Sequence, residues 1–266
     1  MLIYCGRSLV DDLTALGLSA GDTVVVHSSL SSMGHVDGGA GAVVAAMLET
    51  IGRYGTLVVP AYSGAIRDPV PDIPVSDVSP AVLSARDLVP LFDWESTATE
   101  VGAIPRAVLD YPGRRRSAHP QASMAAIGYY AEYICREQPL SFALGSGSPF
   151  EKLVELDAIV LLLGVGHNRC SFLHYVESVA DPSLQRIKIR RFPYEVESQR
   201  VWLEARDVGD DNNTYFPVLG EKFEAVSRTM REGRVRESAA RLFKCREYVS
   251  VTLPLLENLL REAAGL

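Results

Sequence analysis

A histidine and a glutamate three positions apart are the residues best suited to acid–base chemistry. His174 and Glu177 fall in residues 171–179, where the spacing predicts a helix, so both side chains share one helical face. Ser171 lies one turn earlier and can join that face. A histidine beside a carboxylate, just after a buried strand, suits a general base whose tautomer is fixed by the acid. The pattern alone fits a surface or core histidine with a local hydrogen bond at least as well.

A loop rich in hydroxyls and glycines is the second candidate site. It runs His27-Ser-Ser-Leu-Ser-Ser-Met-Gly34 and continues into Asp37-Gly-Gly-Ala-Gly41, which opens a predicted helix. His27 ends a predicted strand, at the sheet edge where open α/β folds bind ligands. Backbone N–H groups in such a loop suit an anion such as a phosphate, although a glycine-rich connector with serine caps has the same pattern. The loop contains neither a P-loop nor a G-x-G-x-x-G dinucleotide fingerprint.

Other catalytic classes have weaker support. The chain has five histidines, but no H-x-x-x-H pair that would place two ligands on one helical face, so we predict no metal site. No G-x-S-x-G elbow marks a serine hydrolase. A cysteine nucleophile rests only on Cys170, which is close to His174 in the chain. The run Arg114-Arg-Arg116 can hold a phosphate, but a solvated charge run is the commoner outcome.

Composition excludes several classes of protein. The 266 residues include 47% hydrophobic and 22% charged side chains, which excludes an intrinsically disordered or collagen-like chain. With 26 Lys and Arg against 33 Asp and Glu, the net charge is −7. This acidic balance argues against a nucleic-acid partner and suits a polycationic small molecule better.

The sequence also bears on the compartment. Four scattered cysteines without a C-x-x-C pair argue against a disulfide framework and a zinc finger, and fit a reducing compartment. No apolar run approaches the roughly 18 residues that span a membrane. Residues 1–10 lack the pattern of a signal peptide. We therefore expect a cytoplasmic protein with no membrane partner.

The elements that must position these residues follow an α/β pattern. Residues 23–27 and 56–60 read as strands and 41–52 as a helix between them, which makes a βαβ unit with a parallel pair. The most apolar strand is predicted at 158–165, directly before the His174 helix. The remaining predictions are helices at 9–16, 101–109, 131–137, 217–231 and 253–263, a strand at 122–127, and an antiparallel pair at 186–192 and 200–206.

Residues 64–99 break this periodicity. Prolines gather there with aspartates such as Asp68, Asp72, Asp77, Asp87 and Asp93. Long irregular segments in compact domains are usually binding loops or lids, so we predict a substrate loop. Neither repeats nor low-complexity segments occur, and we expect residues 1–266 to form a single α/β domain.

Seven short stretches, in a specific order and spacing, carry a resemblance to a known family. They are Gly21-Asp-Thr-Val-Val-Val-His-Ser-Ser-Leu30, Gly55-Thr-Leu-Val-Val-Pro60, Arg116-Ser-Ala-His-Pro120, Gly147-Ser-Pro149, Leu161-Leu-Leu-Gly-Val-Gly166, Leu173-His-Tyr-Val-Glu177 and Arg241-Leu-Phe243. Together they resemble the aminoglycoside 3-N-acetyltransferases over almost the full length. The resemblance implies an α/β/α sandwich around a mixed, largely parallel sheet. It also implies acetyl transfer from acetyl-CoA to the 3-amino group of the deoxystreptamine ring, without a covalent enzyme intermediate.

The resemblance implies a role for each matching residue. His174 matches the general base and Glu177 its neighbouring acid, with Ser171 or a backbone N–H as donor to the oxyanion. The expected contacts to acetyl-CoA are His27, Ser28, Ser29, Leu30, Ser31, Gly34, Val36, Arg116, Ser117 and His119. The expected contacts to the acceptor are Tyr62, Asp68, Glu100, Asn168 and Asp207. Acidic side chains of the 64–99 loop, with Asp207, Asp210 and Asp211, can recruit a polycationic aminoglycoside.

Departures from the family pattern leave other functions open. Many relatives have Asp-x-Asn-Thr-Thr-Leu-His where this chain has Asn168-Arg-Cys-Ser-Phe-Leu-His174, and Thr-Pro where it has Thr97-Ala98. The range of accepted antibiotics is therefore open, as is a role in resistance. The alternatives are an acyltransferase or thioesterase of the same fold acting on another amine or CoA thioester, and a non-catalytic CoA-binding module. We expect a monomer or a homodimer.

Overall fold

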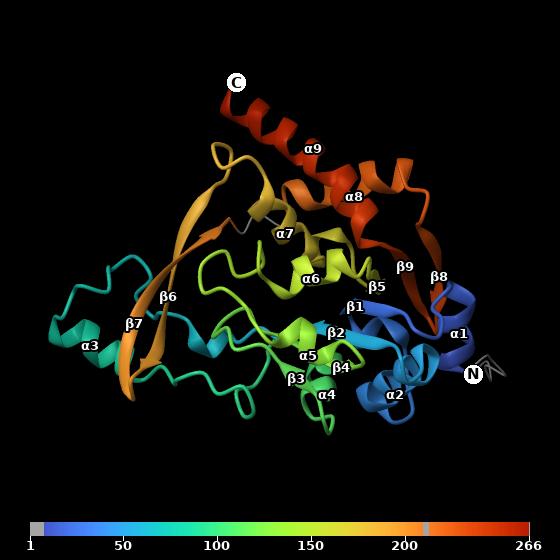
Figure 1. Ribbon diagram of the computed structural model, residues 1–266, viewed down its shortest axis with the longest axis horizontal. Helices are drawn as coiled ribbons and strands as arrows, with labels where there is room; N and C mark the ends of the chain where they lie inside the picture. Colours follow the sequence, from blue (N-terminus) through green and yellow to red (C-terminus); the bar gives the residue numbers. More distant parts are fainter. Residues whose placement is uncertain (1–7, 210–212, 266) are drawn as a thin grey trace.

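The computed structural model describes residues 8–209 and 213–265. Within these residues, seven strands form one mixed sheet in the order β3-β4-β2-β1-β5-β9-β8 (Figure 1). The bounds are β1 Thr23–Ser28, β2 Thr56–Pro60, β3 Arg115–Arg116, β4 Met124–Gly128, β5 Ile159–Leu163, β8 Arg231–Val235 and β9 Ser238–Lys244. The central strands β2, β1 and β5 are parallel, β4 and β9 run against them, and the edge strands reverse again. Five of the seven strands therefore point one way, which confirms a mixed, largely parallel sheet.

Helices cover both faces of this sheet and make it an α/β/α sandwich. Strand side chains alternate between the faces, so Val24 and Val26 pack in one core and Val25 in the other. The first core holds α1 (Leu9–Leu16), α2 (Gly39–Ile51) and α4 (Ala103–Leu109). The second holds α5 (Ala131–Cys135), α6 (Pro149–Glu155), α7 (Phe172–Val179), α8 (Tyr215–Val226) and α9 (Cys245–Ala264). No helix within the described residues is both long enough and apolar enough to cross a bilayer.

The predicted βαβ unit is confirmed, with Thr23 of β1 beside Thr56 of the parallel strand β2. Other predictions are wrong at their ends. The spacing predicts a helix over 217–231, but α8 ends at Val226 and Arg231 begins β8. The last helix begins at Cys245 rather than at 253. Strand β8 escapes detection because it is an edge strand with an exposed face and little hydrophobic alternation.

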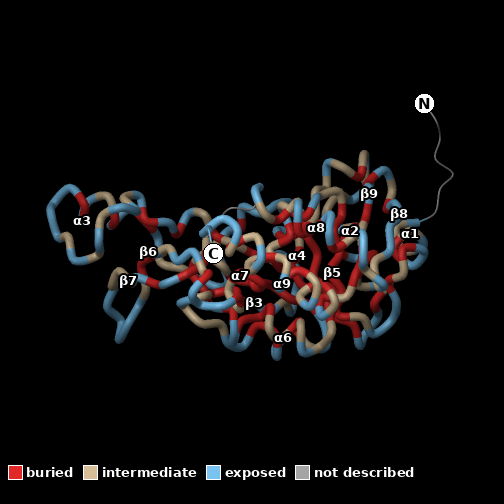
Figure 2. The backbone as a smooth tube through the Cα atoms, turned by 90° about the horizontal axis from the view of Figure 1, so that it is seen from above, coloured by how far each residue is buried: buried red, intermediate tan, exposed pale blue. Residues whose placement is uncertain are grey.

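An arm projects from the sandwich beside the second helical layer. It consists of a two-stranded antiparallel sheet, β6 (Ile187–Val196) and β7 (Gln199–Val208), together with α3 (Pro80–Asp87) (Figure 1). Figure 2 shows the arm extending beyond the buried interior, with much of its chain exposed. The antiparallel pair is confirmed, whereas the prediction that 64–99 lacks regular structure is wrong at α3 and at the short 3-10 helix η2 (Gly64–Ile66).

A buried ion pair holds α3 and its loop to the hairpin. Arg86 is 2% exposed, and its Nε and Nη2 donate to the two carboxylate oxygens of Asp68 at 3.2 and 2.8 Å. The same guanidinium donates to the carbonyl oxygens of Ile73 and Pro74, and lies over the ring of Trp202 on β7. Because an isolated hairpin is only marginally stable, these contacts give the arm a core of its own.

We expect Arg86→Met to destabilise the protein by about 3–5 kcal/mol, since it leaves the Asp68 carboxylate buried without its partner. Urea denaturation measures this change in the free energy of unfolding. Arg115→Met is the matched control, because Arg115 pairs with Glu132 at the surface and such pairs contribute roughly 0–1 kcal/mol. Equal effects of the two substitutions would contradict the anchoring role of Arg86.

Candidate active site

A cleft of about 1150 Å³ opens at the carboxyl ends of the three parallel strands. His27 and Ser28 line it from the end of β1, Tyr62 from the segment after β2, and Gly164 from the segment after β5. His174 lines it from α7. Ligands of open α/β sheets bind at this edge, so the cleft is the candidate active site.

The His174–Glu177 pair has the geometry of an oriented base. Nδ1 of His174 lies 2.7 Å from Oε2 of Glu177, and the two side chains are 13% and 6% exposed. An ionised carboxylate only accepts hydrogen bonds, so Nδ1 carries the hydrogen and Nε2 keeps the lone pair. Glu177 also has Nη2 of Arg186 at 3.8 Å, and Phe216 contacts the imidazole ring edge-on. A neutral His174 can therefore accept a proton from a group bound in the cleft.

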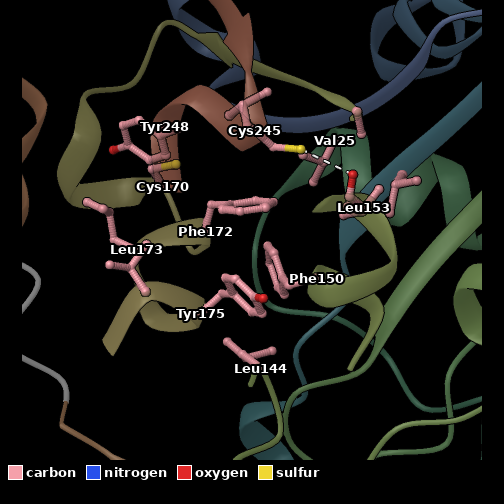
Figure 3. Close-up of a cluster of buried hydrophobic side chains, with 14 of the residues drawn as sticks. Val25, Leu144, Phe150, Leu153, Cys170, Phe172, Leu173, Tyr175, Cys245 and Tyr248 are labelled. Atoms are coloured by element: carbon pink, nitrogen blue, oxygen red, sulfur yellow. Dashed lines mark hydrogen bonds between the residues drawn. The ribbon is translucent and has the colours of Figure 1, made fainter. Parts of the chain in front are cut away.

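The aromatic packing beneath α7 fixes this pair in place. Phe172 packs edge-to-face on Phe150, with ring centroids 5.0 Å apart (Figure 3). Nearby, the Cys245 thiol donates to the carbonyl oxygen of Leu153 at 3.1 Å. Cys170 is fully buried beside Tyr248, and burial raises the pKa of its thiol to about 12. A thiol that stays protonated and inaccessible is no nucleophile, so the cysteine interpretation is wrong.

His27 is a second histidine in the cleft wall and is held neutral. It is 5% exposed, and its Nε2 finds no hydrogen-bond partner among the described residues. Burial, with a smaller contribution from His174, lowers its pKa to about 3. A neutral His27 leaves His174 free to take up a proton without facing a second fixed positive charge.

The hydroxyl loop reaches the cleft with only part of its length. Ser28, Ser29, Leu30 and Ser31 line it, and the hydroxyls of Ser29 and Ser31 lie 3.1 Å apart. Gly34 and Val36 do not line it. Gly34 has φ +70° and lies against Glu237, and Val36 packs against the core beneath α1 and α2.

Three further residues expected at the cofactor are not brought to the cleft. Arg116 is buried and donates to Ser123 Oγ, Ser63 Oγ and the Ala61 carbonyl oxygen. Ser117 donates to Gln138 Oε1 at 2.6 Å. In His119, Nδ1 accepts from the backbone N–H groups of residues 121 and 122, and Nε2 donates to the Leu140 carbonyl oxygen. These side chains support the wall that carries Ser63.

Four of the five residues expected at the acceptor line the cleft, and one does not. Tyr62, Glu100, Asn168 and Asp207 line the cleft, whereas Asp68 is buried away from it in the pair with Arg86. Asp210 and Asp211 lie outside the described residues. Three cationic side chains in the lining, those of Arg67, Arg169 and Arg190, are not predicted from the sequence. Arg190 is ion-paired with Asp207 across β6 and β7, where the register places Asp207 opposite Lys188, two positions before Arg190.

The other histidines do not join the site. The Nδ1 of His167 lies 2.7 Å from the Tyr248 hydroxyl, and its Nε2 lies 2.9 Å from Glu224. His35 is exposed beside Asp37. The described part of the chain contains no group of three His, Cys, Asp or Glu side chains that could hold a metal ion.

The sequence is similar to those of known proteins. The family described as aminoglycoside 3-N-acetyltransferase matches residues 25–257. The SPbeta prophage-derived aminoglycoside N(3')-acetyltransferase-like protein YokD of Bacillus subtilis is 36% identical, over 91% of this chain and 89% of that protein. Aminoglycoside N(3)-acetyltransferase VII of Streptomyces paromomycinus is 32% identical, over 97% and 93% of the two chains.

Solved structures extend the similarity to the fold. The aminoglycoside acetyltransferase AAC(3)-Xa superposes with a TM-score of 0.86 at 34% identity, covering 95% of this chain and 92% of that one. A binary complex of AAC-IIIb with CoASH has a TM-score of 0.84 at 29% identity, with 94% and 95% covered. AAC-VIa bound to sisomicin has a TM-score of 0.83 at 29% identity, with 94% and 96% covered.

The buried histidines should make the fold sensitive to acid. Burial lowers the pKa of His119 to about 4, so the unfolded chain takes up a proton near pH 6.5 before the folded chain does. Stability present above pH 6.5 is therefore lost as the pH falls towards 4, by about 1.4 kcal/mol per pH unit for this group. We expect His119→Gln to reduce this slope in urea denaturation between pH 6.5 and 4.5. The exposed His35→Gln is the control, and an unchanged slope in His119→Gln would contradict the assignment.

Proposed function

The chain belongs to the aminoglycoside 3-N-acetyltransferase family, and we propose that it moves an acetyl group from acetyl-CoA to the 3-amino group of a deoxystreptamine aminoglycoside. The observation that carries this proposal is the imidazole of His174, whose Nδ1 is bound to Glu177 while the ring lines the cleft. Acetylation of that amine removes a positive charge from the drug, and resistance follows as a consequence. Acetyl-CoA is made and used in the cytoplasm, where we place the enzyme.

The proposed reaction is a direct transfer. Amines of an aminoglycoside are largely protonated at neutral pH, so attack on the thioester needs a base. The ammonium first loses one proton to solvent. Nε2 of His174 then takes a second proton from the neutral amine as its lone pair forms the C–N bond, and Glu177 stabilises the imidazolium that results. The C–S bond then breaks, and the departing CoA sulfur receives the proton from His174. The inert Cys170 supports a route without an acyl-enzyme.

The cleft has room and chemistry for acetyl-CoA. Its volume of about 1150 Å³ is slightly above the upper end of the roughly 300–1,000 Å³ typical of small-molecule sites, which suits a large co-substrate. Ser28, Ser29 and Ser31 present hydroxyls at the end of β1, where we place the phosphates. The complex of the relative AAC-IIIb with CoASH supports this use of the cofactor. When bound, acetyl-CoA supplies an activated acyl group.

We place the acceptor beside the carboxylates and the amide of the cleft lining. Glu100 and Asp207 offer carboxylates to ammonium groups, and Asn168 offers an amide. Of these two carboxylates, Asp207 already forms an ion pair with Arg190. Glu100 has no ion pair described, so we expect it to bind an ammonium group of the acceptor more readily. The relative AAC-VIa, solved with bound sisomicin, supports an acceptor of this class.

We expect His174→Ala to lower kcat for acetyl transfer by roughly 10²–10⁴-fold, the usual contribution of a positioned general base. The assay follows CoA thiol release with acetyl-CoA and a panel of aminoglycosides, and mass spectrometry with NMR of the product locates the acetyl group. The substitution removes a group that acts on the amine, so calorimetry should show unchanged binding of acetyl-CoA.

Glu177→Gln is the matched variant and should lower kcat less than His174→Ala does. The amide still accepts the Nδ1 hydrogen bond but stabilises an imidazolium less well. Thiol release by the wild type without any acceptor would point instead to a thioesterase. Retention of more than about a tenth of kcat in His174→Ala would place the base elsewhere.

A further inference from the structure

The phenol of Tyr62 is a buried polar group whose oxygen has no complete hydrogen bond. No described residue bonds it with normal geometry, although the Ser171 hydroxyl lies close enough to interact with it. Native proteins satisfy most buried hydroxyls, so an unsatisfied one needs an explanation. Tyr62 lines the cleft, which places this unused donor where substrates bind.

The position of the phenol relates it to the base. Tyr62 follows the carboxyl end of β2, and its ring packs against the core that also holds Cys170 and Phe172 at the start of α7. Its hydroxyl faces that of Ser171, the residue that precedes α7. His174 lies one turn further along the same helix. The two hydroxyls and the imidazole therefore surround the N-terminal end of α7 inside one cleft.

The protonation state suits a donor. Burial raises the pKa of the Tyr62 phenol, although the nearby Ser171 hydroxyl acts in the opposite direction. The phenol thus keeps its proton across the pH range in which the amine is acetylated. A neutral O–H in a site shielded from water is an effective partner for a developing negative charge.

We propose that Tyr62 is a catalytic residue that donates a hydrogen bond to the carbonyl oxygen of the acetyl thioester and stabilises the oxyanion formed on it. The inference rests on the proposed function. As the amine nitrogen forms the C–N bond, the carbonyl electron pair moves onto oxygen, and the Tyr62 O–H binds it without giving up its proton. The pair returns as the C–S bond breaks. His174 handles the proton of the amine, and Tyr62, together with Ser171, handles the charge on oxygen.

This role differs from the expected role of Tyr62 in binding the acceptor. A residue that binds only the acceptor changes KM for the aminoglycoside and leaves the attack on the thioester by water unaffected. An oxyanion donor changes kcat, and changes hydrolysis of acetyl-CoA without acceptor by the same factor. The two roles therefore give separate kinetic results.

The test uses Tyr62→Phe, which keeps the ring that packs in the core and removes the hydroxyl. We expect kcat for acetyl transfer to fall by about 10²-fold, with KM for both substrates within about threefold of the wild type. Tyr175→Phe is the control, because Tyr175 is a buried tyrosine of the same helix as His174 but does not line the cleft. A raised KM for the aminoglycoside with unchanged kcat would overturn the proposal.

A measurement that needs no turnover tests the role of Tyr62 independently of the proposed acetyl transfer to an aminoglycoside. Infrared spectroscopy of isotope-labelled acetyl-CoA bound to His174→Ala should show the thioester carbonyl band at lower frequency than in water. Adding Tyr62→Phe should shift that band back to higher frequency, and adding Tyr175→Phe should not. The same band in all three proteins would overturn the role of Tyr62. Failure of the wild type to acetylate any aminoglycoside would reject the proposed acceptor and leave the infrared result decisive for Tyr62.

Discussion

The hydrogen bond between Nδ1 of His174 and Glu177 decides which chemistry the cleft can perform. At 2.7 Å it fixes the hydrogen on one ring nitrogen and leaves the other able to accept a proton. Without it the ring could turn or present the wrong tautomer to the substrate. Burial also keeps two nearby side chains uncharged: the imidazole of His27 stays neutral and the thiol of Cys170 stays protonated. His174 is therefore an oriented imidazole in the described lining of the cleft, and the nearby Cys170 thiol stays protonated.

The fold supplies the position of that base. Three parallel strands end at one edge of the sheet, and the chain leaving each of them lines the cleft. Helix α7 follows β5 after a short connection, and the Phe150–Phe172 contact holds it against the second core. The arm forms part of the cleft wall, since Asp207 and Arg190 come from β7 and β6. The Arg86–Asp68 pair, which does not line the cleft itself, holds the loop that carries Arg67.

Local patterns predicted the residues whose task depends on local geometry. His174, Glu177 and Ser171 share a helical face by spacing alone, and the hydroxyls at 28–31 follow a strand that hydrophobicity identifies. The site residues that were predicted wrongly form hydrogen bonds or ion pairs with residues distant in the chain. The sequence predicts Asp68 at the acceptor, but its carboxylate is paired with Arg86, 18 positions later in the chain. His119 looked like a ligand-binding histidine, but backbone groups brought near by the fold occupy both of its nitrogens. The role inferred for Tyr62 likewise came from burial, which no spacing encodes.

The tautomer of His174 tests the central claim most directly. Nitrogen NMR of the protein with labelled histidine, at a pH where the ring is neutral, distinguishes a protonated Nδ1 from a protonated Nε2. We expect Nδ1 of His174 to carry the hydrogen in the wild type, and Glu177→Ala to mix the two tautomers. A wild-type ring with its hydrogen on Nε2 would contradict the account, because no lone pair would then face the amine.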